Sequence, residues 1–494
     1  MKGFNEIQAL LGQELDPTDP DYQYEKYEWI NNLNDKNDNN YNTGLVEIDT
    51  IGVSDGKWLD YHNGYITKPI SIYGETEMLH ADKALLKVAV KNSVTQFIYS
   101  IKLALGANSF IVQNTDNVHL YNHIRSMVNN DVNYEETNGS FFHQAKDTNV
   151  TNGSKEFMKP VTVVGAGPPV TVGVNDIARD ATFNKGFNDR VRLMDPYYER
   201  NGATEAYFKF TACIPLKLIS DFFDRLAYPL LDTRLVMSLG IAGTSAFPYS
   251  FPIMADDATK AKAVNLKFSI GNDGVHPNDR ACKLWVAKVK FTPKVETLLA
   301  QALLDGRLTK EVTFYNCKVV KNPATSAGTG LDFQLSNGIK DPKRVWTVIH
   351  TYDSAKSDIL PSPGVTAQSA SLRNVNMTVN GDKFYETNLN NDHEFYRMFK
   401  DQQYNESDDY QNGSLIQFKD FHPTGGFHKY YCIDISSKTN HLPDPLKPVI
   451  LQIQMDVVGN AAANSYQINH IIEHEVSVVI DMKLGQVSAP LSAV

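Results

Sequence analysis

One pattern occurs twice in this chain, in residues 206–241 and again in residues 427–456. Each copy has an aromatic, strand-like run that ends in Cys-Ile, then a polar or helical connector, then Pro-Leu and an apolar strand. The four pairs are Cys213-Ile214 and Pro229-Leu230 in the first copy, and Cys432-Ile433 and Pro445-Leu446 in the second. Because 216 residues separate the two Pro-Leu pairs, the repeat is too long for a solenoid and predicts a duplicated domain. Two β-domains with equivalent corners and no catalytic constellation indicate a building block rather than an enzyme.

The composition is that of a large folded protein with an acidic balance. A length of 494 residues predicts two or three domains. An apolar fraction of 42%, with 24 Phe and 24 Tyr, is enough for large cores and for well-packed contacts between subunits. The formal net charge is −10. Because binding to phosphates needs clustered Lys and Arg, we expect no direct contact with nucleic acid.

The cysteines indicate a reducing compartment. Cys213, Cys282, Cys317 and Cys432 form no CxxC pair, and the apolar runs around two of them predict buried free thiols. The first residues do not combine a cationic segment with an apolar one, so we expect no secretory signal. No apolar run approaches the ~20 residues that cross a bilayer, so we expect no membrane span.

Short strand patterns dominate the chain and predict an all-β fold. Helical periodicity occurs at 4–14, 118–128 and 294–308, and we interpret the last as the connection between two halves. The polar interval 129–205 is predicted to be an elaborated surface loop. A jelly roll is the sandwich that has about eight strands and tolerates long loops, so we predict two tandem eight-stranded antiparallel jelly rolls. The predicted strand segments are 60–75, 87–105, 283–291, 311–320, 331–337, 344–352, 371–381, 428–436, 449–458 and 476–482.

Residues 470–474 match the HxxEH pattern of a class of zinc proteases. In those enzymes both histidines lie on one helical turn, beside the glutamate that acts as general base. Here the next residues, EVSVVIDM, alternate as a strand does. In a strand His470 and His474 share a face and Glu473 points to the other. We therefore interpret the segment as a strand and expect no metal there.

Three further segments resemble binding motifs, and each lacks an essential feature. The glycine turn at 161–173 continues into Pro-Pro and a strand, not into the helix that would hold a phosphate. His422 and His428 flank a Gly-Gly turn without a Glu at ligand spacing. The run at 31–44 lacks the glycine and the final glutamate of a calcium loop. We expect turns or loops at these places, and no catalytic residue, metal ligand or cofactor in the chain.

Five segments, in their order along the chain, resemble the double jelly-roll major capsid proteins of virophages and Polinton-like viruses, relatives of the adenovirus hexon type. Residues 63–74 look like the first strand region, and 184–194 look like the segment before the paired strands. Residues 210–241 look like the Ile-Pro-Leu segment with its short helix. Residues 371–399 and 432–435 look like their counterparts in the second roll.

The resemblance implies a major capsid protein of an icosahedral virus, found in the virion after assembly in the host cytoplasm or nucleus. Three copies would form a pseudo-hexameric capsomer, whose partners are neighbouring capsomers, pentons and minor capsid or cement proteins. The implied division is an N-terminal arm at 1–58, partly flexible and inside the capsid, then rolls at 59–305 and 306–482, and a tail at 483–494.

Two other functions are compatible with a pair of jelly rolls. One is a glycan-cleaving amidase with acidic residues between the rolls, for which Asp60, Glu311 and Glu473 are the candidates. The other is a lectin-like module whose aromatic loops bind sugars. Both classes are expected to be monomeric or dimeric and to bind glycan, whereas a capsid protein is expected to be an obligate trimer.

Overall fold

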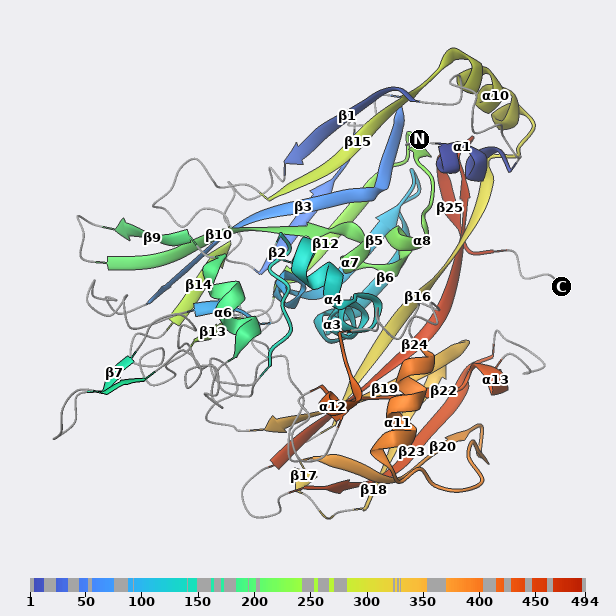
Figure 1. Ribbon diagram of the computed structural model, residues 1–494. Coiled ribbons are helices and arrows are strands. Elements are labelled where there is room, and N and C mark those ends of the chain that lie inside the picture. The colour runs from blue at the N-terminus through green and yellow to red at the C-terminus, as the bar shows by residue number, and fades with distance from the viewer. Residues whose placement is uncertain are drawn as a thin grey trace.

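A computed structural model of the chain consists of two β-sandwiches, one above the other in Figure 1. The structure describes residues 4–12, 24–33, 44–51, 56–74, 88–91, 93–139, 141–148, 161–163, 170–172, 184–193, 195–200, 205–241, 253–255, 266–270, 282–322, 325–326, 328, 330–352, 370–402, 415–421, 428–439, 447–459 and 465–490.

The first half has two main antiparallel sheets. The larger has the order β1-β15-β3-β10-β9, with β11 and β14 also paired to β3, and the smaller has the order β2-β12-β5-β6. The strands are β1 (Tyr24–Leu33), β2 (Leu45–Asp49), β3 (Trp58–Gly74), β5 (Ile98–Leu105), β6 (Phe110–Asp116), β9 (Asp195–Arg200), β10 (Glu205–Pro215), β11 (Leu230–Leu231), β12 (Leu235–Ile241), β14 (Leu266–Ile270) and β15 (Lys283–Phe291). Two small pairs are β4 (Val88–Val90) with β13 (Ile253–Ala255), and β7 (Val161–Val163) with β8 (Val170–Val172).

The second half also has two antiparallel sheets. Their orders are β16-β24-β19-β22, with β17 and β25 also paired to β24, and β18-β23-β20-β21. The strands are β16 (Thr309–Lys321), β17 (Thr325–Ser326), β18 (Gly330–Ile339), β19 (Pro342–Tyr352), β20 (Ser371–Val379), β21 (Asp382–Lys383), β22 (Tyr430–Asp434), β23 (Val449–Val458), β24 (Ser465–Asp481) and β25 (Gln486–Ser488).

Short helices connect the strands. They are α1 (Phe4–Leu11), α3 (Val118–Asn129), α4 (Val132–Tyr134), α6 (Lys185–Arg192), α7 (Leu216–Ile219), α8 (Asp221–Arg225), α10 (Pro293–Leu304), α11 (Asp392–Asp401), α12 (Phe418–Phe421) and α13 (Ser436–Thr439), with a 3₁₀ helix at Val94–Phe97 and a π-helical turn at Glu135–Gly139. The three predicted helices are present as α1, α3 and α10. The last of these connects the two halves, and the left-handed backbone of Gly306 follows it (φ 71°).

The two halves repeat one topology. In chain order, β1, β2, β3, β5, β6, α3, β10, β12 and β15 correspond to β16, β18, β19, β20, β21, α11, β22, β23 and β24. Corresponding strands also have the same neighbours in their sheets. Each half therefore contains two four-strand sheets in one order, the arrangement of an eight-stranded jelly roll. The prediction of two tandem antiparallel jelly rolls is confirmed, and every predicted strand segment contains a strand.

Each roll has its own apolar core, and two long strands join the cores. Ile66 and Leu284 are buried in the first core, and Val345 is buried in the second. The strand β24 runs from Tyr466 in the second core to Ile480 in the first. Its partner β16 follows the same path, so one hydrogen-bonded ribbon connects the two sandwiches (Figure 1).

Strands also lie outside the predicted limits of the rolls. Within the predicted arm 1–58, β1 pairs with β15 and β2 pairs with β12, and Val46 and Ile48 of β2 are fully buried. The apolar alternation of β2 is short and follows a polar Asn/Asp run, which hides it in the sequence. In the predicted tail 483–494, β25 pairs with β24 and buries Val487. The described parts of both segments therefore belong to the first sandwich.

Part of the interval 129–205, predicted to be a surface loop, is buried. Arg190 of α6 is fully buried and lies 2.6 Å from the carboxylate of Asp147. Its guanidinium also donates to the backbone carbonyls of Val90 and Ala145. Charged residues are normally exposed, but a charge with this many partners tolerates burial. The polar composition of the interval therefore gave the wrong expectation for these residues.

Candidate functional site: the junction between the rolls

The HxxEH segment is a strand, as predicted. His470 lies on β24, where Nδ1 is 2.9 Å from Thr347 Oγ1, and burial lowers the pKa of His470 to about 3. Glu473 is also buried, and it accepts hydrogen bonds from Arg344 Nη1 at 2.7 Å and Trp346 Nε1 at 3.2 Å. Burial raises the pKa of Glu473, against the opposing effect of Arg344. These side chains have structural partners within the second roll.

The other motifs lie only partly within the described residues. On either side of the glycine-rich residues 164–169, which lie outside them, β7 and β8 pair antiparallel. His428 is fully buried with Nε2 2.9 Å from the backbone carbonyl of Asp147, and burial lowers the pKa of His428. His422 and most of 31–44 lie outside the described residues. Within the described part of the chain, no three His, Cys, Asp or Glu side chains form a group that could hold a metal ion, and no helix is long and apolar enough to cross a membrane.

The three carboxylates considered for an amidase have separate surroundings. Asp60 accepts a hydrogen bond from the Tyr27 hydroxyl at 2.8 Å within the first sheet. Glu311 is exposed near one end of β16, and Glu473 pairs across the sheet with Cys317, six residues further along that strand. Their positions indicate three local roles, because a glycan-cleaving site needs carboxylates that face one substrate.

The described corner residues are buried, and the two Cys-Ile pairs lie on equivalent strands. Cys213 and Ile214 end β10, and Cys432 and Ile433 lie on the corresponding strand β22. All four are buried, as is Leu230, which pairs with Leu59 of β3.

Burial raises the pKa of Cys213 to about 11, so its thiol stays protonated at neutral pH. Pro229 is also buried, whereas Pro445 and Leu446 lie outside the described residues.

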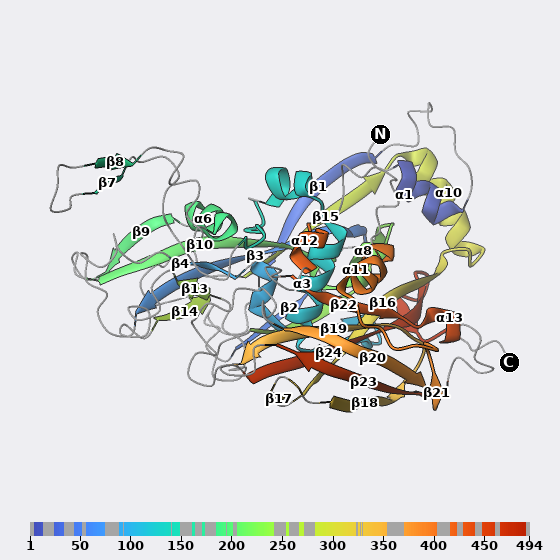
Figure 2. The ribbon, with the colours of Figure 1, turned by 60° about the horizontal axis from the view of Figure 1, so that its bottom comes forward.

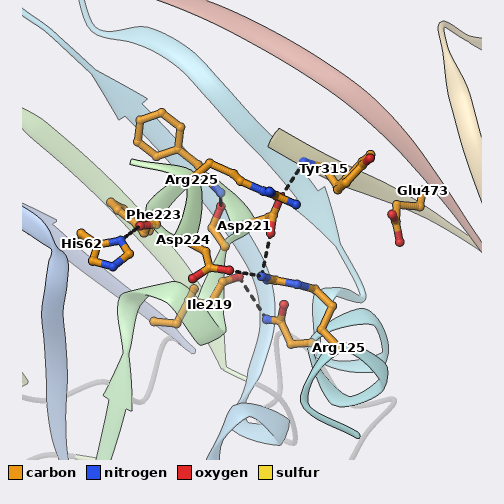
Figure 3. A network of polar contacts seen from close by, with 12 residues as sticks. His62, Arg125, Ile219, Asp221, Phe223, Asp224, Arg225, Tyr315 and Glu473 are labelled. Atoms are coloured by element: carbon orange, nitrogen blue, oxygen red, sulfur yellow. Dashed lines mark hydrogen bonds and ion pairs between the residues drawn. The ribbon is translucent and has the colours of Figure 1, made fainter. Parts of the chain in front are cut away.

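The structure brings together a set of charged residues that sequence patterns do not connect. At the junction between the rolls, Arg125 of α3 donates to Asp221 Oδ1 of α8 at 2.8 Å. The other oxygen of Asp221 accepts a hydrogen bond from the backbone N–H of Tyr315, on β16 of the second roll, at 2.8 Å. Figure 3 shows Arg125, Arg225 and Tyr315 around this one carboxylate. One acidic side chain thereby joins three elements across the junction.

The second roll supplies the opposing side of the junction. The guanidinium of Arg344 lies 5.1 Å from the ring centroid of Tyr315 and binds Glu473. A cavity of about 20 Å³ lies among these residues and Arg125, which is room for about one water molecule. A buried polar junction of this kind specifies how two surfaces fit, because displaced partners would leave charges unpaired.

Further contacts extend the junction on both sides. Gln113 and Thr115 of β6 donate to Asn316 Oδ1 of β16 at 3.1 and 2.8 Å. Lys146 Nζ lies 2.9 Å from Asp420 Oδ2 of the second roll. These contacts join segments about 200 and 274 residues apart, and no spacing in the sequence indicates them. Among the sequence patterns, the duplication alone indicates such a junction, because two equivalent domains in one chain are expected to pack against each other.

No protein-family model matches the chain, and no curated protein matches it. Two solved structures share its fold over nearly the whole length. A chain in the cryo-EM structure of the Sputnik virophage has a TM-score of 0.56 at 12% identity, and the match covers 95% of this chain and 89% of that one. The mavirus major capsid protein has a TM-score of 0.53 at 12% identity, covering 97% of this chain and 92% of that one. With its two rolls of one topology and the ribbon that joins them, the chain has the double jelly-roll fold of the mavirus major capsid protein.

Proposed function

We propose that the chain is a major capsid protein that assembles as homotrimers into pseudo-hexameric capsomers of an icosahedral shell. The observation that carries the proposal is the match to the mavirus major capsid protein, which covers 97% of this chain and 92% of that protein. The match therefore includes both rolls and their connection. A sandwich alone supports many functions, whereas a side-by-side pair of equivalent rolls is suited to building a ring with repeated contacts.

The junction between the rolls supports this proposal. The strands β16 and β24 join the two sandwiches, and the polar contacts of Asp221 and Asn316 fix their relative position. Three such rigid pairs around one axis place six similar rolls in a ring, which closes with few exposed sheet edges. The described parts of both ends, α1 and β25, contribute to the same core (Figure 1), and Figure 2 shows α1 beside α10 from a second direction. In this proposal that end of the subunit faces the capsid interior.

Light scattering coupled to size-exclusion chromatography tests the proposal on the full-length chain. We expect one species near three times 55.3 kDa, with hexagonal outlines in negative-stain images or spontaneous shells. Penton and minor capsid or cement proteins are then the partners to seek in virions.

A monodisperse monomer at micromolar concentration would contradict the capsid proposal. Glycan arrays and an amidase assay on that monomer would then distinguish the lectin-like and enzymatic alternatives. A trimer that binds no glycan and lacks amidase activity would leave the capsid function as the one supported.

A further inference from the structure

Three aromatic side chains form a continuous group on the outer side of the large sheet of the first roll. The ring centroids of Trp29 and Tyr65 are 5.3 Å apart, and those of Tyr65 and Trp285 are 6.1 Å apart and stacked. Trp29 is 40% exposed, and the other two are half-buried. None of the three belongs to the apolar core of this roll. We call these three residues the aromatic surface.

The strand registers place the aromatic surface at positions equivalent to the junction. Cys213 is opposite Thr67, and its counterpart Cys432 is opposite Trp346. Thr67 and Trp346 are therefore equivalent positions. Tyr65 and Arg344 lie two residues before them, so these two are equivalent as well. Trp285 pairs with Tyr65 and Glu473 pairs with Arg344, so Trp285 and Glu473 are equivalent. The registers of the next strands in the two sheets, β1 and β16, place Trp29 and Tyr315 at equivalent positions in the same way.

In the second roll these equivalent positions are covered by the first roll. Tyr315, Arg344 and Glu473 line the small cavity together with Arg125 of α3 and Asp221 of α8. The neighbouring strand β6 completes the cover through its hydrogen bonds to Asn316. The side of the first roll that binds the outer sheet of the second therefore consists of α3 before the sixth strand β10, α8 after that strand, and the edge strand β6.

The same side exists on the second roll. Its elements are α11, α13 and β21, which correspond to α3, α8 and β6 in chain order. They are contiguous, because Lys438 Nζ of α13 donates to the carbonyl of Lys383 on β21 at 3.2 Å, and Gln402 next to α11 donates to Asp434 next to α13. Where α3 is buried on nearly all sides, α11 exposes His393 and Arg397. The C-terminal end of this side, at Gln402, reaches the cavity of the chain's own junction. Within the described residues, no roll covers α13, β21 or the exposed positions 393 and 397 of α11.

We propose that the aromatic surface binds the α11–α13–β21 side of a second copy of this chain. The contact would repeat, between copies, the junction that each chain already makes between its own rolls. The chemistry is complementary, because cationic side chains such as Arg397 and Lys383 are attracted to the faces of exposed tryptophan and tyrosine rings, and aromatic residues are enriched at such interfaces. The inference rests on the proposed trimer and identifies its contact surface.

Acrylamide quenching of the native trimer tests whether the surface is covered. The chain has four tryptophans, and Trp58 and Trp346 are buried within the subunit. Quenchable emission must therefore come from Trp29 and Trp285. If the surface is covered, the substitution Trp29→Phe leaves the quenching constant of the trimer unchanged. A fall in that constant would show that Trp29 is open to solvent in the trimer and would overturn the inference.

Photo-crosslinking identifies the occupant. With p-benzoylphenylalanine placed at position 29, we expect crosslinks between subunits that map to residues 382–383, 392–401 or 436–439. Intersubunit crosslinks confined to other segments would overturn the inference. The matched control places the same group at position 458, because Val458 is 49% exposed on β23 and pairs with Ser371, at the opposite end of β20 from β21. The control should give no crosslinks to these three segments.

A substitution distinguishes this inference from the capsid proposal. The cation introduced by Trp29→Lys would face Arg397 and Lys383, so trimers should dissociate to folded monomers while Val458→Lys remains trimeric. If a folded Trp29→Lys chain remains trimeric, the proposed contact of the aromatic surface is wrong, while the capsid proposal still stands. A native chain that is itself monomeric overturns both proposals.

Discussion

The Asp221 carboxylate accepts a hydrogen bond from the backbone N–H of Tyr315 at 2.8 Å, and so ties the first roll to the second. The same carboxylate is paired with Arg125 at 2.8 Å and is nearly buried. The backbone of β16 is therefore held at one fixed point by a charge that already has a partner. This geometry makes the junction sensitive to single substitutions.

Asp221→Ala should destabilise the chain by about 3 kcal/mol, because it leaves the largely buried Arg125 without its main partner. The backbone N–H of Tyr315 also loses its acceptor. Urea unfolding followed by circular dichroism measures the change. The matched control is Asp224→Ala, since Asp224 is 44% exposed and its oxygen lies 3.9 Å from Arg125. Equal losses from both variants would show that the buried pair contributes nothing specific.

Gly186→Ala should destabilise the buried part of the 129–205 interval by roughly 1–3 kcal/mol, the usual range for overpacking. A Cβ at Gly186 would lie 2.1 Å from the backbone carbonyl oxygen of Lys146, so α6 would have to move away. That movement would separate Arg190 from Asp147. Thermal unfolding measures the effect. Gly338→Ala is the control, because a Cβ there meets no atom within 4 Å; a similar loss from both variants would contradict the close-approach argument.

The sequence predicted the architecture because the apolar alternation and the repeated Cys-Ile and Pro-Leu pairs survive in both halves. Strands such as β15 and β23 alternate strongly, and their predicted bounds, 283–291 and 449–458, are those of the structure. The strand β2 was missed because its five residues lie close behind a polar run. The burial of Arg190 was missed because its partner Asp147 is 43 residues away, and no local pattern announces such a pair.

The contacts of the junction could not be predicted from the sequence for the same reason, because their partners are even further apart along the chain. Asp221 and Tyr315 are 94 residues apart, and Arg344 and Glu473 are 129 apart. Each has an ordinary local sequence, and only the folded topology gives them a common location. The duplication did carry usable information, since it identified which strands are equivalent. Strand registers then connect the covered surface of one roll with the exposed surface of the other.

Leu230→Asp should abolish soluble trimer, because Leu230 is fully buried in the first core and a carboxylate there would be unpaired. The duplicated corner predicts the same result for Leu446→Asp, at a position outside the described residues. Soluble yield and size-exclusion chromatography measure both. The control is Leu304→Asp, since Leu304 is 76% exposed on α10. Normal trimers from both Leu230→Asp and Leu446→Asp would refute the equivalence of the corners.

Stability should fall as the pH drops from about 6.5 towards 4. Burial lowers the pKa of His143 and of His350 to about 4, and that of His470 to about 3. In this range the unfolded chain binds more protons than the folded one, so acid favours unfolding. At pH 5 each of these histidines costs about 2 kcal/mol relative to neutral pH. Burial raises the pKa of Glu473, so its contribution has the opposite sign.

Urea unfolding at pH 7.5, 6 and 5 measures the loss. His470→Gln should make the profile shallower, because it removes one group that the folded chain keeps neutral and the unfolded chain protonates. Its own cost at pH 7.5 reflects the lost contact with Thr347 and is measured separately. An unchanged profile in this variant would mean that His470 accepts a proton within the folded roll, and hence that water reaches β24 there.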